Sequence, residues 1–199
     1  MRGRGFLQAR LPDKRPMTTP WLDKVPIETP RLVLRGLVRG DAARMARYVG
    51  DIGVARMLAV VPLPYSEADA ETFIAAMAGI NATGGGLGLA VAEREAPGLL
   101  IGVMSFIGAL PTVEIGWWLG RPYWGRGYTT EAARALIAVA FAEPRLDRVV
   151  AGAFFDNPAS LRVQDKLGFA RTGESQRHSL ARRAFVRHID TEIARPPRP

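Results

Sequence analysis

Hydrophobic and polar positions divide this chain into short segments with different periods. Segments that alternate, or that are rich in β-branched and aromatic residues, are predicted to be strands. They comprise residues 31–35, 87–93, 99–109, 112–120 and 146–154, with two more after residue 169, the last at about 187–193. Amphipathic segments behind a capping residue are predicted to be helices. They comprise residues 41–49, 66–80, 128–143 and 157–167.

The order of these segments predicts one mixed sheet. Three strands between residues 87 and 120 are joined by short turns, which is typical of an antiparallel meander. The strand that ends near Leu119 is followed by a helix and by a strand that begins near Asp147. Such a crossover is right-handed and makes its two strands parallel. We therefore predict an α+β (mixed α/β) fold with one parallel strand pair, and the strand at 31–35 at an edge.

Local signals predict where several helices begin and end. Asp41 is predicted to cap the helix that runs to about Val49. Ser66, with Asp69 three residues later, forms a capping box at a helix start. Gly168 is predicted to end the helix before it as a left-handed cap. Residues 81–86 contain three successive glycines and no helix start follows them, so we interpret them as a flexible connection and not as a phosphate site.

One domain accounts for most of the chain. Residues 1–24 are basic, contain Pro12, Pro16 and Pro20, and show no period, so we predict a flexible N-terminal extension, with Met17 as an alternative start. Residues 25–195 contain no internal repeat and no linker. They are predicted to form a single domain, as a monomer or a homodimer.

The net charge of +8 is concentrated at the two ends of the chain. Residues 1–16 carry five basic residues and one acidic residue, and residues 170–199 carry seven and three, so the ends account for the whole excess. A neutral body argues against a broad nucleic-acid-binding face, although the ends can steer an acidic partner.

Composition excludes several kinds of chemistry. The 199 residues contain no cysteine, which excludes disulfides, zinc-thiolate sites and an acyl-cysteine intermediate. Two histidines make a multi-histidine metal centre or a Ser-His triad improbable, and we expect no metal. No apolar run approaches the roughly 20 residues that span a bilayer, and the N-terminus lacks the apolar core of a secretory signal. We expect a cytoplasmic protein without membrane contact.

A glycine-containing loop precedes the helix at residues 128–143. Gly125 and Gly127 are followed by the start signal Thr129, Thr130 and Glu131, so that backbone amides converge on a helix N-terminus. This arrangement is typical of an anion site, and with the preceding strand it would form a phosphate cradle. A plain turn with a helix cap would give the same pattern.

At this point the element order and the motifs resemble the GNAT superfamily of N-acetyltransferases, and most closely its ribosomal-protein N-terminal alanine acetyltransferase branch. The resembling segments are 28–35, 114–119, 123–132 and 157–169. The resemblance implies a twisted sheet with helices on both faces, whose parallel strand pair splays apart to admit acetyl-CoA. The residues that it assigns to acetyl-CoA are Trp117, Trp118, Leu119, Trp124, Gly125, Arg126, Gly127, Tyr128, Thr129, Thr130, Asn157 and Ser160.

Within this set the resemblance implies separate tasks. Residues 117–119 would pair with the pantetheine, and the amides of residues 125–130 would receive the pyrophosphate. The chain departs from the family in two places. Thr129 occupies a position where a small residue is usual, and Gln164 replaces the tyrosine that serves many members as general acid. Gln164 cannot protonate a leaving thiolate.

Without cysteine, direct attack of an amine on the thioester in a ternary complex is the economical mechanism. Glu114 is the predicted base, acting through a water, because burial among apolar neighbours would raise its pKa toward neutrality. A sheet-surface carboxylate paired with an arginine is the alternative. Ser160 is the predicted proton donor to sulfur and Asn157 a hydrogen-bonding residue, and simple capping by Asn157 explains the same pattern.

The acceptor is expected at the irregular segments 57–65 and 176–183, with Met57, Tyr65 and His178 as candidate liners. An N-terminal α-amine has a pKa near 7.7–8.0 and needs less help from a base than lysine near 10.4, so we rank peptide N-termini above small amines. A nonenzymatic basic RNA- or ribosome-associated module is the rival function from a different class.

Overall fold

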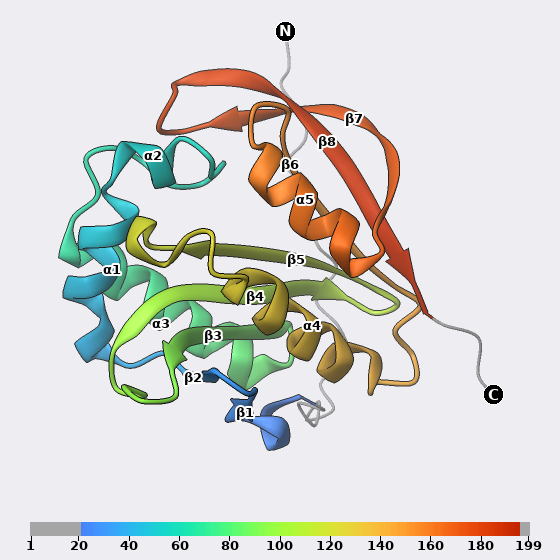
Figure 1. Cartoon of the computed structure of the whole chain (residues 1–199), viewed down its shortest axis with the longest axis horizontal. Coiled ribbons are helices and arrows are strands. Elements are labelled where there is room, and N and C mark those ends of the chain that lie inside the picture. The colour runs from blue at the N-terminus through green and yellow to red at the C-terminus, as the bar shows by residue number, and fades with distance from the viewer. Residues whose placement is uncertain (1–20, 196–199) are drawn as a thin grey trace, which may run out of the picture.

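The computed structural model describes residues 21–195 as one mixed sheet with helices on both faces (Figure 1). The strand order is β1-β2-β3-β4-β5-β6-β8-β7. The strands are β1 (Ile27–Glu28), β2 (Leu32–Gly36), β3 (Gly86–Glu93), β4 (Leu100–Ala109), β5 (Thr112–Leu119), β6 (Arg148–Phe154), β7 (Ala170–Ser179) and β8 (Ala184–Ala194). The α-helices are α1 (Ala42–Val49), α2 (Ile52–Ala55), α3 (Glu67–Thr83), α4 (Tyr128–Phe141) and α5 (Pro158–Leu167).

The predicted topology is confirmed. Strands β3, β4 and β5 form the antiparallel meander, and β5 pairs with β6 in parallel after the crossover through α4. The parallel pairing covers only the three positions from Thr112↔Arg148 to Glu114↔Val150. Beyond Glu114 the two strands separate, so residues 115–119 of β5 keep an unpaired backbone edge toward β6. This splay is the feature around which the site is built.

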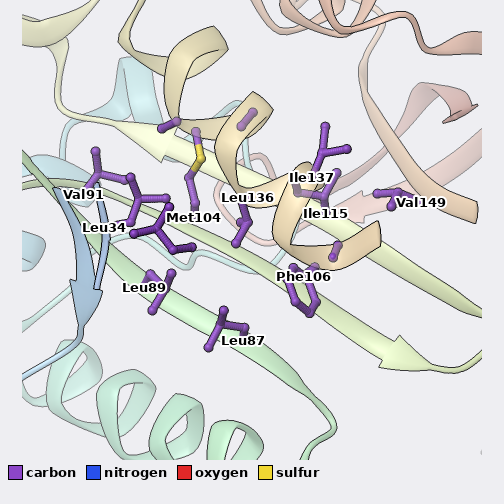
Figure 2. Packing of buried hydrophobic residues seen from close by; sticks show 14 of the residues in the cluster. Leu34, Leu87, Leu89, Val91, Met104, Phe106, Ile115, Leu136, Ile137 and Val149 are labelled. Carbon is purple, nitrogen blue, oxygen red and sulfur yellow. The ribbon is translucent and has the colours of Figure 1, made fainter. Parts of the chain in front are cut away.

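The two faces of the sheet bury separate cores because side chains alternate along the strands. On one face, α4 places Leu136 and Ile137 against strand residues such as Leu89, Met104 and Ile115 (Figure 2). On the other face, α1 and α3 cover a smaller core; its main members are Met45, Val49, Ile74, Leu100 and Val103. Figure 1 shows α4 and the α1–α3 pair on opposite sides of the sheet. The sheet therefore lies between two separate hydrophobic cores, and the splay of β5 and β6 opens a gap in it.

Two of the predicted helix ends are confirmed. Ser66 and Asp69 form the capping box of α3, and Gly168 ends α5 at φ +88°. The prediction of a flexible connection over residues 81–86 is wrong, because α3 continues to Thr83. The Asn81 side chain exchanges two hydrogen bonds with the backbone of Gly88, at 2.7 and 3.1 Å, which fixes the entry into β3.

Three further expectations at the start of the fold need correction. The strand near residues 31–35 is not at the sheet edge, because β1 pairs along its outer side. The Asp41 carboxylate does not cap α1 but accepts hydrogen bonds from the Val38 amide and the Arg35 guanidinium. Trp21 is buried against Phe106, so the folded part includes residue 21 and does not begin at residue 25. The predicted flexible extension otherwise lies outside the described residues.

No helix among residues 21–195 combines the length and apolar character that crossing a membrane requires.

Candidate active site

A cavity of about 370 Å³ lies between the splayed half of β5, the N-terminus of α4 and the first turns of α5. Eleven of the twelve residues assigned to acetyl-CoA by resemblance line it, and Arg126 is the exception. The other liners are Val54, Met57, Leu58, Tyr123, Pro158, Ala159, Arg162, Val163 and Lys166. We call this space the donor cavity.

The glycine loop leaves a row of backbone donors free at the mouth of the donor cavity. Gly125 and Gly127 adopt φ +75° and +78°, a region that residues with a side chain rarely occupy. Gly127 is the N-cap of α4 and no side chain caps this helix. Within residues 21–195, the amides of residues 125–130 have no backbone or side-chain acceptor. Six adjacent free amides at a helix N-terminus are an arrangement that suits an anion.

Glu131 braces this loop and does not cap it. Its carboxylate accepts hydrogen bonds from Thr29 Oγ1 at 2.7 Å and from the Arg31 guanidinium at 2.6–2.7 Å. Burial alone would raise the pKa of Glu131, but the hydrogen bonds from Thr29 and Arg31 together lower it. Arg31 Nη1 also donates to the Arg126 carbonyl at 3.0 Å. Arg31 thus neutralises the charge of Glu131, so this carboxylate does not cancel the positive potential of the amides at residues 125–130.

Arg126 is placed differently from the expectation. Its guanidinium lies 3.7 Å from Glu93 Oε1 and stacks over the Tyr123 ring at 5.7 Å. Two other cations line the donor cavity instead, Arg162 and Lys166, one turn apart on α5. Their i, i+4 spacing was the signal in the sequence that would have identified them.

The splayed edge of β5 forms one wall of the donor cavity. Trp117 and Trp118 point to opposite faces of the sheet, because successive residues of a strand alternate. The Trp124 indole donates a 2.7 Å hydrogen bond to the Leu119 carbonyl and so holds the loop against the strand end. The unpaired edge beside it offers backbone donors and acceptors in the spacing of a strand.

The N-terminus of α5 forms the opposite wall. Asn157 Oδ1 accepts a 3.1 Å hydrogen bond from the Ser160 amide, so the capping role of Asn157 is confirmed. Gln164 is buried, accepts a hydrogen bond from Thr191 Oγ1 at 2.8 Å, and donates to Ser160 Oγ at 3.4 Å. This relay occupies a lone pair of Ser160 and leaves its O–H proton available to another acceptor.

A second cavity, of about 500 Å³, lies on the opposite face of the sheet. Residues Leu58, Trp117, Trp118 and Ser160 line both cavities, so the two adjoin at the splay. We call the second space the acceptor cavity. Its remaining liners come from α1, the segment 59–65, α3, β4, β5, β6, β7 and β8.

Glu114 lines the acceptor cavity but is not buried, which contradicts the premise of its assignment as base. Its side chain is 48% exposed and forms an ion pair with Arg177 at 2.7 Å. The apolar neighbours Val113 and Ile115 are buried on the other face of the strand. The geometry therefore matches the alternative interpretation, a sheet-surface carboxylate paired with an arginine.

The three predicted acceptor residues have different locations. Tyr65 lines the acceptor cavity, where burial and then the charge of Asp69 raise its pKa to about 12. It therefore keeps its proton at physiological pH. Met57 lines the donor cavity instead. His178 lines neither cavity, because it lies near the end of β7 with its ring 5.2 Å from the Phe185 ring.

Sequence reasoning missed the second histidine, His188, which lines the acceptor cavity. Its Nδ1 lies 2.7 Å from Asp190 Oδ1. The signal was present in the sequence, since His188 and Asp190 are separated by two positions in a predicted strand and so share a face.

Within residues 21–195, no group of three or more His, Cys, Asp or Glu side chains is arranged to hold a metal ion.

Comparison with known proteins places this site in a family. The family model described as the acetyltransferase (GNAT) domain matches residues 31–170. The uncharacterized N-acetyltransferase YnaD of Bacillus subtilis is 32% identical over 149 residues, which cover 74% of this chain and 84% of the relative. The probable N-acetyltransferase YjcK of the same organism is 39% identical over 83 residues, covering 40% and 46%. The putative ribosomal N-acetyltransferase YdaF, also of B. subtilis, is 38% identical over 63 residues, covering 32% and 34%. The last two matches thus span less than half of each relative.

Solved structures share the fold. A GNAT-family acetyltransferase from Bacillus anthracis is similar with a TM-score of 0.72 and 25% identity, over 84% of this chain and 97% of that one. The microcin C7 self-immunity acetyltransferase MccE, in complex with acetyl-CoA and AMP, gives 0.75 and 20%, over 85% and 99%. The ribosomal-protein-S5-alanine acetyltransferase from Vibrio fischeri gives 0.72 and 20%, over 84% and 94%. The predicted resemblance is confirmed: the chain belongs to the GNAT family of acetyltransferases, which use acetyl-CoA as acetyl donor.

Proposed function

We propose that this chain is a cytoplasmic N-acetyltransferase that moves an acetyl group from acetyl-CoA to a protein N-terminal α-amine by direct attack in a ternary complex. One observation carries the proposal. Two cavities on opposite faces of the sheet adjoin at the splay of β5 and β6, and share Trp117, Trp118 and Ser160. A donor and an acceptor that enter from opposite faces would meet there without either one having to leave first.

The donor cavity fits acetyl-CoA through its chemistry. The six free amides of residues 125–130 suit a pyrophosphate, and Arg162 and Lys166 suit a further phosphate. The unpaired edge at residues 117–119 suits the two amides of pantetheine, which pair as a strand would. In this arrangement the thioester lies at the shared wall, next to Ser160.

Ser160 is the proposed proton donor to the departing sulfur. The Gln164 amide donates to Ser160 Oγ, so the serine O–H is free to point into the junction. When the amine nitrogen bonds to the carbonyl carbon, the C–S bond breaks and the Ser160 proton passes to sulfur. Ser160 recovers a proton from the nitrogen, so that the products are an amide and a thiol.

Glu114 has a different proposed role from the one that the sequence suggested. Because it is exposed and paired with Arg177, we assign it to the wall of the acceptor cavity, where it fixes Arg177 and attracts the acceptor ammonium. Asp69 adds a second carboxylate at this cavity. These two carboxylates outnumber the one arginine among the cavity liners, Arg177, and the excess negative charge favours a cationic amine over an anionic acceptor.

The ranking of peptide N-termini above small amines has two supports. An α-amine is close to neutrality at pH 7–8 and needs only one modest base, since its pKa is about 7.7–8.0. YdaF, a relative over part of its length, carries the name of a putative ribosomal N-acetyltransferase.

A thiol-release screen tests the proposal. Purified protein and acetyl-CoA are combined with a panel of peptides with free N-termini, polyamines, amino acids and aminoglycosides. Each peptide is matched with its N-terminally blocked form that keeps one internal lysine. We expect turnover on free N-termini and none on blocked peptides. Turnover confined to small amines would overturn the acceptor ranking. If RNA stabilised the protein in a thermal-shift assay and acetyl-CoA did not, the assignment as an enzyme would be overturned.

A further inference from the structure

His188 is a buried imidazole with one nitrogen fixed and the other free. It lies on β8 opposite Phe154 of β6, and its side chain is 8% exposed. Nδ1 lies 2.7 Å from Asp190 Oδ1, and Ser175 Oγ donates to the same oxygen at 3.1 Å. A carboxylate accepts and cannot donate, so Nδ1 of a neutral ring carries the proton and Nε2 carries the lone pair.

The surroundings fix the plane of the ring. A Cβ at Gly152 would lie 2.2 Å from His188 Cε1, so this glycine leaves room for the imidazole on β6. The Phe154 ring meets it edge-on at 5.8 Å. Nε2 has no hydrogen-bond partner among residues 21–195, yet it is not one of their fully enclosed unpartnered polar atoms. Because His188 lines the acceptor cavity, Nε2 is the nitrogen left to reach it.

Burial, more than the neighbouring charges, favours the neutral form of this imidazole. Burial lowers the pKa of His188 below its ordinary value of 6.5, and this outweighs the hydrogen bond to Asp190, which raises it. Arg177 on β7 also lowers the pKa, whereas the charges of Asp190 and Glu114 raise it. At pH 7 the ring is therefore a neutral acceptor, which is the state that a base requires.

We propose that His188 Nε2 is the general base that removes the proton from the acceptor ammonium, with Asp190 as the residue that positions the imidazole. This deepens the proposed function and rests on it. The N–H bond of the ammonium breaks and its proton forms a bond to Nε2, which yields the neutral amine that attacks the thioester. The imidazolium then returns this proton to solvent, so one proton is released for each amide and thiol formed.

The placement distinguishes His188 from the carboxylates at the same cavity. Glu114 is 48% exposed and is held by Arg177, whereas His188 is enclosed and its only charged hydrogen-bond partner within the described residues is Asp190. Because the Glu114 carboxylate is exposed and paired with Arg177, the acceptor cavity does not orient it toward the amine. The His188 imidazole is fixed, so its Nε2 lone pair points in one direction.

The pH profile of the variants tests this assignment. His188→Gln should lower kcat/KM on an N-terminal peptide by about 10²- to 10⁴-fold at pH 7, the general range for a lost acid or base. The deficit should shrink as the pH rises past the acceptor's own pKa of about 7.7–8.0, because the amine then loses its proton without help. Asp190→Asn should show a smaller loss with the same pH trend. The affinity for acetyl-CoA should stay at the wild-type value in both.

The matched control is His178→Gln, which changes the other histidine of the chain, outside both cavities. It should retain wild-type turnover at every pH. A deficit in His188→Gln that is constant with pH, or equal turnover of His188→Gln and wild type, would overturn the role of His188. A wild-type protein that acetylates no amine would instead overturn the proposed function, so the two failures are distinguishable.

A second measurement does not depend on turnover and is made on the wild-type protein. With only two histidines, NMR of ¹⁵N-labelled wild-type protein can resolve both imidazoles, with His178→Gln assigning them. We expect His188 to be neutral at pH 7 with its proton on Nδ1. A ring protonated at pH 7, or one with its proton on Nε2, would contradict the proposal.

Discussion

The donor and acceptor cavities share a wall but are built in different ways. The donor cavity uses backbone, with six free amides before and within α4 and the unpaired edge of β5. The acceptor cavity uses residues from nine separate parts of the fold, which lie between Met45 and His188. Backbone recognition suits a ligand that stays the same, whereas scattered side chains can change one at a time. We therefore expect the donor side to be similar among members of the family and the acceptor side to differ from one member to the next.

The same difference explains what holds each cavity in place. The donor loop is braced by Glu131, which is fixed by Thr29 and Arg31 from the first strands of the sheet. The acceptor cavity is bounded by the segment 57–65 and by the β7–β8 hairpin. Arg56, next to the first segment, and Arg182 in the hairpin both form ion pairs with Asp156. A substitution on one side should thus leave the other side intact.

The largest effect is expected from Gly127→Val. Valine tolerates φ +78° poorly, at a cost of about 1–3 kcal/mol, and relaxation of the loop would turn the amides away from the ligand. We expect the Kd for acetyl-CoA to rise by about 100-fold or more, equivalent to about 2.7 kcal/mol. Isothermal titration calorimetry measures it. Gly36→Val is the control, because a Cβ at Gly36 meets no atom within 4 Å and its φ is not positive. Wild-type affinity in Gly127→Val would show that this backbone does not bind the donor.

Ser160→Ala should affect turnover and leave binding unchanged. Alanine keeps the backbone N–H that donates to Asn157, so the helix cap survives and only the hydroxyl at the junction is lost. We expect kcat to fall by about 10²-fold, as for a lost proton donor, with the Kd for acetyl-CoA unaltered. Stopped-flow turnover and calorimetry separate the two quantities. An unchanged kcat would leave protonation of sulfur to water.

The sequence identified most of the residues that line the donor cavity, for a physical reason. Its signals are contiguous: glycines with positive φ, a helix start and an Asn-Pro cap each act within a few residues. The fold followed from period, turn length and the handedness of one crossover, together with the family resemblance. The helix end at residue 83, the side-chain cap of α1, the cover of β2 by β1 and the burial of Trp21 were predicted wrongly. Each depends on contacts that the local pattern does not reveal, such as the packing of Trp21 against Phe106.

The acceptor side was harder because its contacts are tertiary. Glu114 was expected to be buried because its sequence neighbours are apolar, but neighbours on a strand face the opposite side. His178 was chosen over His188 because it lies in an irregular-looking segment, whereas the geometry that makes His188 distinctive comes from Gly152 and Phe154 on another strand. No local pattern carries that information.

Glu114→Gln sharpens the assignment of roles within the acceptor cavity. If the carboxylate were the base, kcat would fall by about 10²- to 10⁴-fold. Because it is exposed and paired with Arg177, we expect a loss below about tenfold, seen mainly as a higher KM for the amine, since exposed ion pairs contribute about 0–1 kcal/mol. Steady-state kinetics with varied peptide measures both constants. A large fall in kcat that His188→Gln does not share would restore Glu114 as base.

The smallest effect concerns the ion pairs that connect the acceptor-side segments to α5. The Asp156 carboxylate receives both Arg182 Nη atoms at 3.0 Å and Arg56 Nη2 at 2.9 Å. Burial alone would raise the pKa of Asp156, but the hydrogen bonds and charge of Arg182, with the charge of Arg56, lower it. The stabilisation is therefore present above the unfolded pKa of about 3.9 and is lost as the pH falls through the lower folded value.

Asp156→Asn should accordingly reduce the free energy of unfolding by about 1 kcal/mol at pH 7, a value between those of exposed and buried pairs. The difference from wild type should shrink as the pH falls below about 3.9, because the unfolded chain then gains its proton first and the folded chain follows at its lower pKa. Urea denaturation at several pH values measures this. Glu174→Gln is the control, because Glu174 and Arg187 are 55% and 54% exposed and 3.6 Å apart.

The kinetic constants of Asp156→Asn give a second comparison. A higher KM for the amine with an unchanged Kd for acetyl-CoA would show that these ion pairs shape only the acceptor side. Equal changes in both constants would mean that the two cavities are mechanically coupled through α5.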